Sequence, residues 1–288
     1  MIKKRTFAKL DLATHISSNK LNDGHYPVDY IDCQINLFDE LLIEQKGQDI
    51  EIICDNPNVP KNKENLIYKA AQLLKDIKGD KKLGAKIILK KSIPIKAGFG
   101  GGSSDAAATL QALEKLWKIK LTKDQVSNLA KKLGKDFYYS LHGGLAEVQG
   151  RGKNYKVIPL SYRLPKFWVL IIVPSAQKPS TSWVYEHLNT KSIGQSFDRF
   201  KRLKKAISEN NKENILGSVY NDFEKSVSSH YPVVKKIKED LTKAGASAAL
   251  MAGAGLSVVG FFNSSQKVKE AKRKLTNKYS QIFITKII

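Results

Sequence analysis

A glycine-rich segment near position 100 is the part of the sequence best suited to chemistry. Four of the five residues from Gly98 to Gly102 are glycines, and Ser103, Ser104 and Asp105 follow them. Without Cβ atoms, the backbone can adopt left-handed dihedral angles and bring its N–H groups close to an anion. A helix expected after the loop would direct the positive end of its dipole at the same place. These features predict a cradle for a polyphosphate.

The segment does not match other common phosphate-binding sequences. No Gly-Lys-Ser/Thr ends it, as in a Walker A loop. Ser103 stands where the dinucleotide-binding fingerprint has its third glycine. The catalytic-loop and metal-loop signatures of protein kinases are also missing. The residues alone therefore leave open a second interpretation, a turn whose glycines only let a helix pack closely.

The composition indicates a folded protein with a sizeable core. The chain has 288 residues, of which 42% are hydrophobic, and this length allows two domains. No stretch reaches the roughly 18 apolar residues that a membrane span requires, and no signal sequence is recognised at the N-terminus. We therefore expect the protein in the cytoplasm. Cys33 and Cys54 are too few and too far apart for a disulfide framework or a metal site, and we expect both to be buried.

The formal net charge of +22 has two interpretations. It could mark a nucleic-acid-binding surface or a funnel for a polyanionic ligand. It could instead reflect a surface coated evenly with lysine. Only six residues are arginine, the side chain preferred for reading bases and phosphates, and the lysines are spread along the whole chain. The second interpretation is favoured, although the charge still suits an acidic ligand such as a nucleotide.

Hydrophobic periodicity predicts a mixture of strands and helices that must position the glycine loop. The expected strands are Phe7–Ile16, Val28–Asn36, Glu40–Gln45, Asp49–Cys54, Ala85–Leu89, Leu145–Val148, Trp168–Val173, Ala248–Leu250, Leu256–Phe262 and Gln281–Ile284. The expected helices are Glu64–Ile77, Ser103–Trp117, Thr122–Leu133, Thr181–Leu188, Phe197–Ser208, Val233–Ala244 and Lys267–Thr276. Ser103, Ser104 and Asp105 suit the N-cap and first turn of their helix, as Thr122 suits the N-cap of the next. The order shows no strict βαβ rhythm, which favours an α+β fold.

The run from Pro94 to Ala107 resembles the phosphate loop of the GHMP kinases. Further segments resemble this superfamily in the same order along nearly the whole chain: Ala8–Leu12, Asn22–Tyr26, Glu64–Ala71, Gly134–Asp136, Gly143–Gly152, Asn221–Glu224 and Ala249–Gly255. Each segment is a weak signal alone, but their order and spacing together are specific. The three successive glycines and the Ser-Ser-Asp-Ala-Ala that follows resemble the branch that acts on a cytidine diphosphate-linked methylerythritol.

The resemblance implies a two-domain α+β fold and an ATP-dependent kinase of a small molecule. Residues 1–160 would form an N-terminal domain like ribosomal protein S5, and residues 161–288 a ferredoxin-like C-terminal domain. The residues implied to hold ATP are Pro94, Ile95, Lys96, Ala97, Gly98, Phe99, Gly100, Gly101, Gly102, Ser103 and Ser104. Mg²⁺ is expected with the nucleotide, with no protein carboxylate assigned as its ligand. A membrane partner is not expected, and the oligomeric state is left open.

The resemblance also assigns roles at the acceptor side. Asp136 would take the proton from the acceptor hydroxyl, while Lys9 would polarise that hydroxyl and hold Asp136 ionised. Asp11, His25, Tyr26 and Tyr185 would bind the substrate, with aromatic rings stacking on its cytosine base.

Four segments depart from the family pattern and leave the acceptor open. Asp11 stands for an asparagine, His25–Tyr26 inverts Tyr-His, Lys135–Tyr139 replaces Ala-Asp-Val-Pro-Phe, and Ala252–Leu256 replaces Ser-Gly-Ser-Gly-Ser. The alternatives are a GHMP kinase for another hydroxyl acceptor, or a non-catalytic relative whose basic surface binds nucleic acid.

Overall fold

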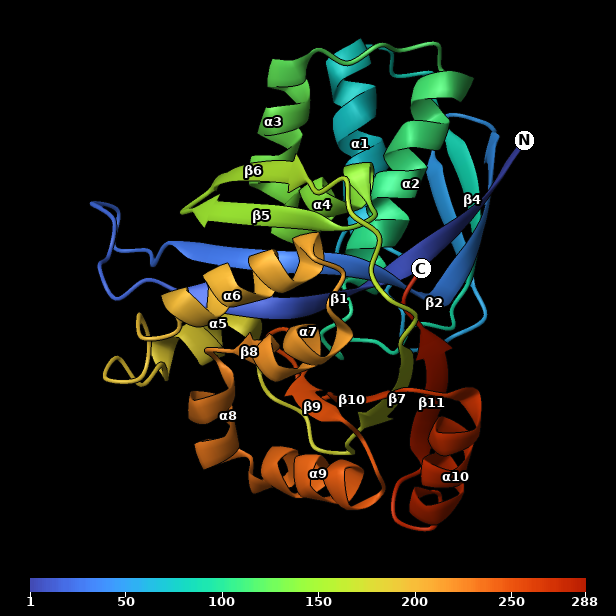
Figure 1. Cartoon of the computed structure of the whole chain (residues 1–288). Coiled ribbons are helices and arrows are strands. Elements are labelled where there is room, and N and C mark those ends of the chain that lie inside the picture. The colour runs from blue at the N-terminus through green and yellow to red at the C-terminus, as the bar shows by residue number, and fades with distance from the viewer.

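The computed structural model describes residues 1–288 and contains two β-sheets with helices packed around them (Figure 1). The first sheet consists of β1 (Ile2–Ile16), β2 (Val28–Gln45), β3 (Ile50–Cys54), β4 (Ala85–Lys90), β5 (Ala146–Arg151), β6 (Asn154–Pro159) and β8 (Tyr220–Asn221). The second consists of β7 (Trp168–Val173), β9 (Ala248–Met251), β10 (Val258–Phe262) and β11 (Gln281–Lys286), in the order β11-β7-β10-β9. The fold is thus α+β, as expected.

Ten helices complete the chain. They are α1 (Leu66–Lys78), α2 (Gly101–Leu116), α3 (Lys123–Leu133), α4 (Lys135–His142), α5 (Thr181–Glu186), α6 (Phe197–Ser208), α7 (Lys212–Ser218), α8 (Glu224–His230), α9 (Pro232–Lys243) and α10 (Ser265–Leu275). Figure 1 shows α1, α2 and α3 grouped above the long strands β1 and β2, with the second sheet and α9 and α10 below them. The first sheet therefore lies between the α1–α3 group and the second sheet.

The antiparallel pair β1–β2 forms the centre of the first sheet. Most residues from Ala8 to Ile16 are fully buried, because β1 has β2 on one side, short β8 on the other and helices packed on its faces. The register places Lys9 opposite Gln34 and Asp11 opposite Asp32. The register shifts on either side of these pairs, with extra residues on β2 opposite the step from Phe7 to Ala8 and one extra residue on β1 between Asp11 and Ala13. Charged side chains are thereby held deep inside the fold.

The two sheets share one hydrophobic core. A cluster of 26 buried residues includes Leu10 and Ile31 of the first sheet together with Ile171 and Phe261 of the second. Phe167 meets the ring of Phe261 edge to face, with the centroids 6.0 Å apart. The expected boundary after residue 160 falls between β6 and β7, but β8 returns to pair with β1. The division at residue 160 stays a prediction.

Several expectations about single elements are confirmed and others are wrong. Thr122 caps α3 in a full capping box, as its side chain predicted. Val28–Asn36 and Glu40–Gln45 were expected as two strands, but β2 is continuous and carries two extra residues, Asn36 and Leu37, opposite the step from Phe7 to Ala8. The short elements β6, α4, α7 and α8 were not predicted, since each has too few residues for a clear period. No helix has the length and the apolar content required to span a bilayer.

The shared core makes a stability prediction. Replacing Phe261, which is fully buried, by alanine removes a large apolar side chain from the contact between the sheets. The free energy of unfolding should fall by about 3–5 kcal/mol, measured by urea denaturation. Tyr162→Ala removes an aromatic ring that is 48% exposed and should change stability by less than about 0.5 kcal/mol. Equal effects of the two substitutions would show that Phe261 is not part of the core.

Candidate functional site

The glycine loop ends in an uncapped helix N-terminus. Gly98 and Gly100 have positive φ angles of 94° and 65°, which side-chain-bearing residues rarely adopt. Gly100 is the N-cap of α2 and offers no side-chain hydrogen bond, so the first N–H groups of the helix have no partner in the chain. Backbone donors and the positive end of a 16-residue helix therefore point to the same place. This geometry is suited to an anion such as a nucleotide phosphate.

One expectation about this helix is wrong. Ser103, Ser104 and Asp105 do not form its N-cap, because the helix begins two residues earlier, at Gly101. Asp105 is instead buried, with Oδ2 2.8 Å from Lys91 Nζ, and Oδ1 accepts a hydrogen bond from Thr6 Oγ1 at 2.6 Å. Burial raises the pKa of Asp105 to about 7, although Lys91 acts in the opposite direction. Asp105 therefore joins the N-terminal part of α2 to β1 rather than capping the helix.

A second glycine loop, Ala252–Gly255, lies directly against the first. A Cβ atom added to Gly98 would be 2.1 Å from the carbonyl oxygen of Ala252, and one added to Gly255 would be 2.6 Å from the carbonyl oxygen of Ala97. Asn221 holds this second loop, because its side-chain N–H₂ donates to the carbonyl oxygens of Met251 and Gly253 at 2.9 and 2.7 Å. The two loops can approach this closely only with glycine at the contact positions.

Lys9 and Asp136 both lie beside Gly100, as the family resemblance implied. The backbone N–H of Lys9 donates to the carbonyl oxygen of Phe99 at 2.9 Å, which fixes β1 to the loop. A Cβ atom on Gly100 would be 2.9 Å from Lys9 Cγ and 3.7 Å from Asp136 Cβ. Side chains from β1 and α4 therefore meet at the uncapped end of α2, although they are 127 positions apart in the sequence.

Asp136 occupies the first turn of α4, where a carboxylate is favoured by the helix dipole. Its Oδ1 atom is 2.9 Å from Lys135 Nζ and 3.8 Å from Lys9 Nζ, yet it accepts no hydrogen bond from the chain. Burial favours the protonated form, but the charges of Lys135 and Lys9 outweigh it and hold the pKa of Asp136 below its ordinary value. The side chain is 31% exposed, although its Oδ1 atom is buried.

Lys9 is held more tightly by Asp11 than by Asp136. Lys9 Nζ donates to Asp11 Oδ1 at 2.5 Å, and both side chains are almost fully buried. Burial lowers the pKa of Lys9, but Asp11 and Asp136 together raise it above its ordinary value, which keeps the ammonium group charged. Lys9 was expected to keep Asp136 ionised. It is not the main positive charge at Asp136, because Lys135 lies nearer to that carboxylate.

Lys9, Asp11, Asp32, Lys135 and Asp136 form one charged cluster beside Gly100. Sequence reasoning missed two of its members. The family pattern singles out Lys135 only as a departure, and it gives Asp32 no role. Lys135 Nζ lies 3.0 Å from Asp32 Oδ2. Asp32 sits inside an apolar strand pattern, so periodicity alone gave no signal for a charged role. The position of Lys135, directly before Asp136, was the available clue.

The expected substrate-binding residues lie in different surroundings. His25 is exposed in the loop between β1 and β2, where its ring faces Asp23, and Tyr26 is half-buried with Lys20 near its ring. Tyr185 of α5 packs edge to face on Phe223 and places its hydroxyl 3.5 Å from that of Tyr30. Tyr185 is thus half-buried and part of the core surroundings.

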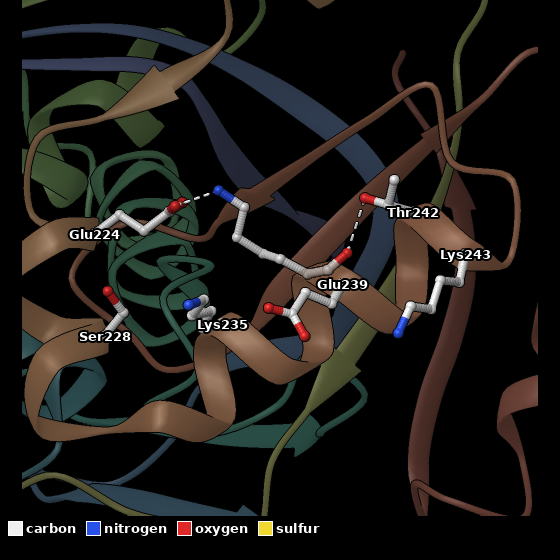
Figure 2. Close-up of a pocket in the computed structure, with 7 residues that line it drawn as sticks. Glu224, Ser228, Lys235, Glu239, Thr242 and Lys243 are labelled. Carbon is white, nitrogen blue, oxygen red and sulfur yellow. Dashed lines mark hydrogen bonds and ion pairs between the residues drawn. The ribbon is translucent and has the colours of Figure 1, made fainter.

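No group of three His, Cys, Asp or Glu side chains is arranged to hold a metal ion. A surface hollow between α8 and α9 is also unrelated to this cluster (Figure 2). It is lined by Glu224, Ser228, Lys235, Lys238, Glu239, Thr242 and Lys243. None of these residues belongs to the glycine loops or to the charged cluster, and Lys238 is already paired with Glu224. The candidate site is therefore the meeting point of α2, β1 and α4.

Comparison with protein families gives two matches along the chain. Residues 65–148 match the GHMP kinases N terminal domain, and residues 190–281 match the GHMP kinases C terminal family. The first match includes the glycine loop and Asp136, and the second includes Asn221 and the loop Ala252–Gly255. The α+β two-domain organisation of this superfamily is thereby present in the chain.

Full-length relatives and solved structures agree with these matches. The chain is 36% identical to a 4-diphosphocytidyl-2-C-methyl-D-erythritol kinase of Geobacillus sp., with 98% of this chain and 95% of that protein covered. It is 33% identical to the enzyme of the same name from Thermoanaerobacter pseudethanolicus, with 100% and 96% covered. A crystal structure of 4-(cytidine 5'-diphospho)-2C-methyl-D-erythritol kinase superposes with a TM-score of 0.79 at 25% identity over 99% of both chains.

More distant structures share the fold alone. L. major mevalonate kinase superposes with a TM-score of 0.73 at 16% identity, covering 100% of this chain and 96% of that one. The two relatives from Thermoanaerobacter pseudethanolicus and Geobacillus sp. are far more similar, at 33% and 36% identity over at least 98% of this chain. The chain therefore belongs to the GHMP kinases and, within them, to the family of 4-diphosphocytidyl-2-C-methyl-D-erythritol kinases.

Proposed function

We propose that this protein transfers the γ-phosphoryl group of ATP to the 2-hydroxyl of 4-diphosphocytidyl-2-C-methyl-D-erythritol, in the non-mevalonate route to isoprenoid precursors. One observation carries the proposal: Asp136 and Lys9 lie beside Gly100, at the uncapped N-terminus of α2. An ionised base, an ammonium group and a set of free backbone donors are thereby brought together. Phosphoryl transfer requires positioning and charge neutralisation of this kind.

The residues of the cluster have separate roles in this reaction. Asp136 accepts the proton of the acceptor hydroxyl as the oxygen attacks the γ-phosphorus, and the bond from that phosphorus to the bridging oxygen breaks to release ADP. Lys9 orients the hydroxyl and offsets negative charge as it develops. The N–H groups at the start of α2 bind the phosphates, with the remaining residues of Pro94–Ser104 forming the loop around them.

Mg²⁺ fits this site only with the nucleotide as its main ligand. The chain supplies no cluster of three acidic or histidine ligands, but Ser103 is part-exposed in the first turn of α2 and carries a hydroxyl. Mg²⁺ commonly binds through substrate phosphates, its own waters and one or two protein oxygens. When bound, it would neutralise charge on the phosphates.

On the acceptor side, we propose that His25, Tyr26 and Tyr185 recognise the cytosine base, with Tyr185 held by Phe223 and Tyr30. Asp11 is 2% exposed and paired with Lys9, so it would act on the acceptor through Lys9 rather than by direct contact. The cytoplasm is the expected location, because ATP is available there and both free cysteines, Cys33 and Cys54, are buried and unpaired.

Turnover of ATP with the cytidyl substrate is the direct test of the proposed function. Formation of ADP that requires this acceptor would support it. ADP formation with another alcohol but not with this one would reassign the acceptor. Salt-dependent nucleic-acid binding without any turnover would favour a non-catalytic protein instead.

The close contact between the loop at Gly98 and the loop Ala252–Gly255 predicts that one added methyl group weakens ATP binding. Gly98→Ala places a Cβ where the carbonyl oxygen of Ala252 lies and requires a strained positive φ. The dissociation constant for ATP should rise by about tenfold or more, since about 1.4 kcal/mol of strain changes a binding constant tenfold. Gly217→Ala in α7, whose Cβ would meet nothing within 4 Å, should leave ATP affinity unchanged. Unaltered affinity in Gly98→Ala would remove this loop from the nucleotide site.

The role of Asp136 is tested by Asp136→Asn. The amide has nearly the same shape but cannot accept the proton, so kcat should fall by about 10²–10⁴-fold. ATP binding, measured by calorimetry, should persist because the glycine loop is unchanged. A variant that retains the wild-type rate would exclude Asp136 as the base.

The role of Lys9 is tested by Lys9→Ala. Loss of the ammonium group should lower kcat by about 10²–10³-fold with a smaller change in the KM for ATP. Lys3→Ala on the same strand is the matched control, because the side chain of Lys3 is 68% exposed. If both variants turn over equally fast, Lys9 takes no part in the mechanism. Thermal unfolding of both variants shows whether the chain remains folded.

A further inference from the structure

The charged cluster beside Gly100 contains more carboxyl groups than one lysine can neutralise. Asp11 and Asp32 are direct partners across β1 and β2, and both are almost completely buried. Asp136 adds a third carboxyl group from α4, and only Lys9 and Lys135 lie close enough to balance the three. Like charges directly opposite each other in a sheet are destabilising, so this arrangement depends on nearby positive charge.

The two lysines divide the carboxyl groups between them. Lys9 Nζ is 2.5 Å from Asp11 but 3.8 Å from Asp136. Lys135 Nζ is 2.9 Å from Asp136, 3.0 Å from Asp32 and 3.8 Å from Asp11. The nearest positive charge to the proposed base is therefore Lys135, while Lys9 is engaged mainly by the neighbouring carboxylate on its own strand.

Three ionised carboxyl groups would outnumber the two ammonium groups, and Asp32 is the carboxyl group whose surroundings most favour a proton. Burial and the charge of Asp11 raise the pKa of Asp32 well above its ordinary value, whereas the two lysines lower the pKa of Asp11 despite its burial. One buried oxygen of each carboxyl group, Asp11 Oδ2 and Asp32 Oδ1, has no hydrogen-bond partner in the chain, which fits a proton retained on Asp32. Two carboxylates, on Asp11 and Asp136, then face two ammonium groups.

The side chain of Lys135 is fixed in this position. It is 13% exposed, and its Nζ lies 3.6 Å from the ring centroid of Tyr30, where a cation is attracted to the π-electrons. The carboxylates raise the pKa of Lys135 well above its ordinary value in spite of burial, which favours its charged form. The other titratable groups that act on Asp136 or feel its charge are Lys9 and Asp11 from β1, Tyr30 from β2, Tyr139 from α4, Tyr155 from β6 and Tyr185 from α5.

We propose that Lys135 is a positioning residue that acts through Asp136, holding this carboxylate oriented and ionised while Asp11 engages Lys9. The inference rests on the proposed function, in which Asp136 is the base. It also gives a common physical reason for two departures from the family pattern, Asp11 in place of asparagine and Lys135 in place of alanine. Asp11 adds a buried negative charge that pairs with Lys9. Lys135 adds a positive charge that pairs with Asp136 in place of Lys9.

The first test measures Asp136 without any substrate. The protein is labelled with ¹³C at the aspartate carboxyl carbons, and the Asp136 signal is assigned by its loss in Asp136→Asn. In Lys135→Met the titration midpoint of this signal should rise by about 1–3 pH units, because an opposite charge is removed. In Lys132→Met, which removes an exposed lysine of α3, the midpoint should stay at its wild-type value. A midpoint unchanged in Lys135→Met overturns the proposal.

A second pair of variants covers the case in which Lys135→Met does not fold. Asp11→Asn/Lys135→Met loses one charge of each sign, so the cluster remains balanced. Its Asp136 midpoint should be at least about one pH unit higher than in Asp11→Asn alone, and close to that of the unaltered protein. Equal midpoints in these two variants would likewise overturn the proposal.

Kinetics then connect the titration to turnover. Activity requires ionised Asp136 and is lost as the pH falls through its pKa, so the acid limb of kcat/KM should move to higher pH in Lys135→Met. Lys135→Arg, which keeps the charge, should restore most of the shift. An acid limb that does not move, with the titration midpoint raised, would show that Asp136 is not the base and would contradict the proposed function rather than the role of Lys135.

Discussion

The structure depends on keeping several charges paired in the interior of the protein. Lys9, Asp11 and Asp32 are buried on the central strands β1 and β2, where an isolated charge would be strongly unfavourable. The ion pair between Lys9 and Asp11 and the contacts of Lys135 make this burial possible. Because these groups have few other partners, the register of β1 against β2 and the position of α4 are coupled to the same set of contacts.

Backbone packing adds a second constraint beside the charges. The loop before α2 and the loop Ala252–Gly255 approach so closely that added Cβ atoms would overlap carbonyl oxygens. The second loop has lost the serine hydroxyls of the family pattern, but Asn221 still fixes its carbonyl groups and the glycines still permit the contact. The loop Ala252–Gly255 therefore keeps its backbone conformation although it has no side-chain hydroxyl donors. This fits a role in supporting the loop before α2.

The sequence predicted the parts of the site that depend on local chemistry. The glycine run predicted a loop followed by a helix, which the structure has, and ordered motifs brought Lys9 and Asp136 into one hypothesis. The sequence alone could not show that Asp105 is buried against Lys91. This contact joins α2 to the residue directly after β4 and depends on tertiary packing. Asp32 was hidden for a similar reason, since its environment is set by β1, β5 and α4 together.

The distinction between buried and exposed charge also bears on the net charge of +22. Exposed charges more than about 8–10 Å apart are largely screened at physiological salt, whereas buried pairs are screened much less. The surface lysines can therefore increase the rate at which a nucleotide meets the protein, in a manner that salt weakens. They cannot replace Lys9 or Lys135, which act at 2.5–3.8 Å in surroundings that exclude most water. The chemistry proposed here is consequently set by a local balance of two lysines against two carboxylates, and the total charge of the chain affects mainly the encounter that precedes it.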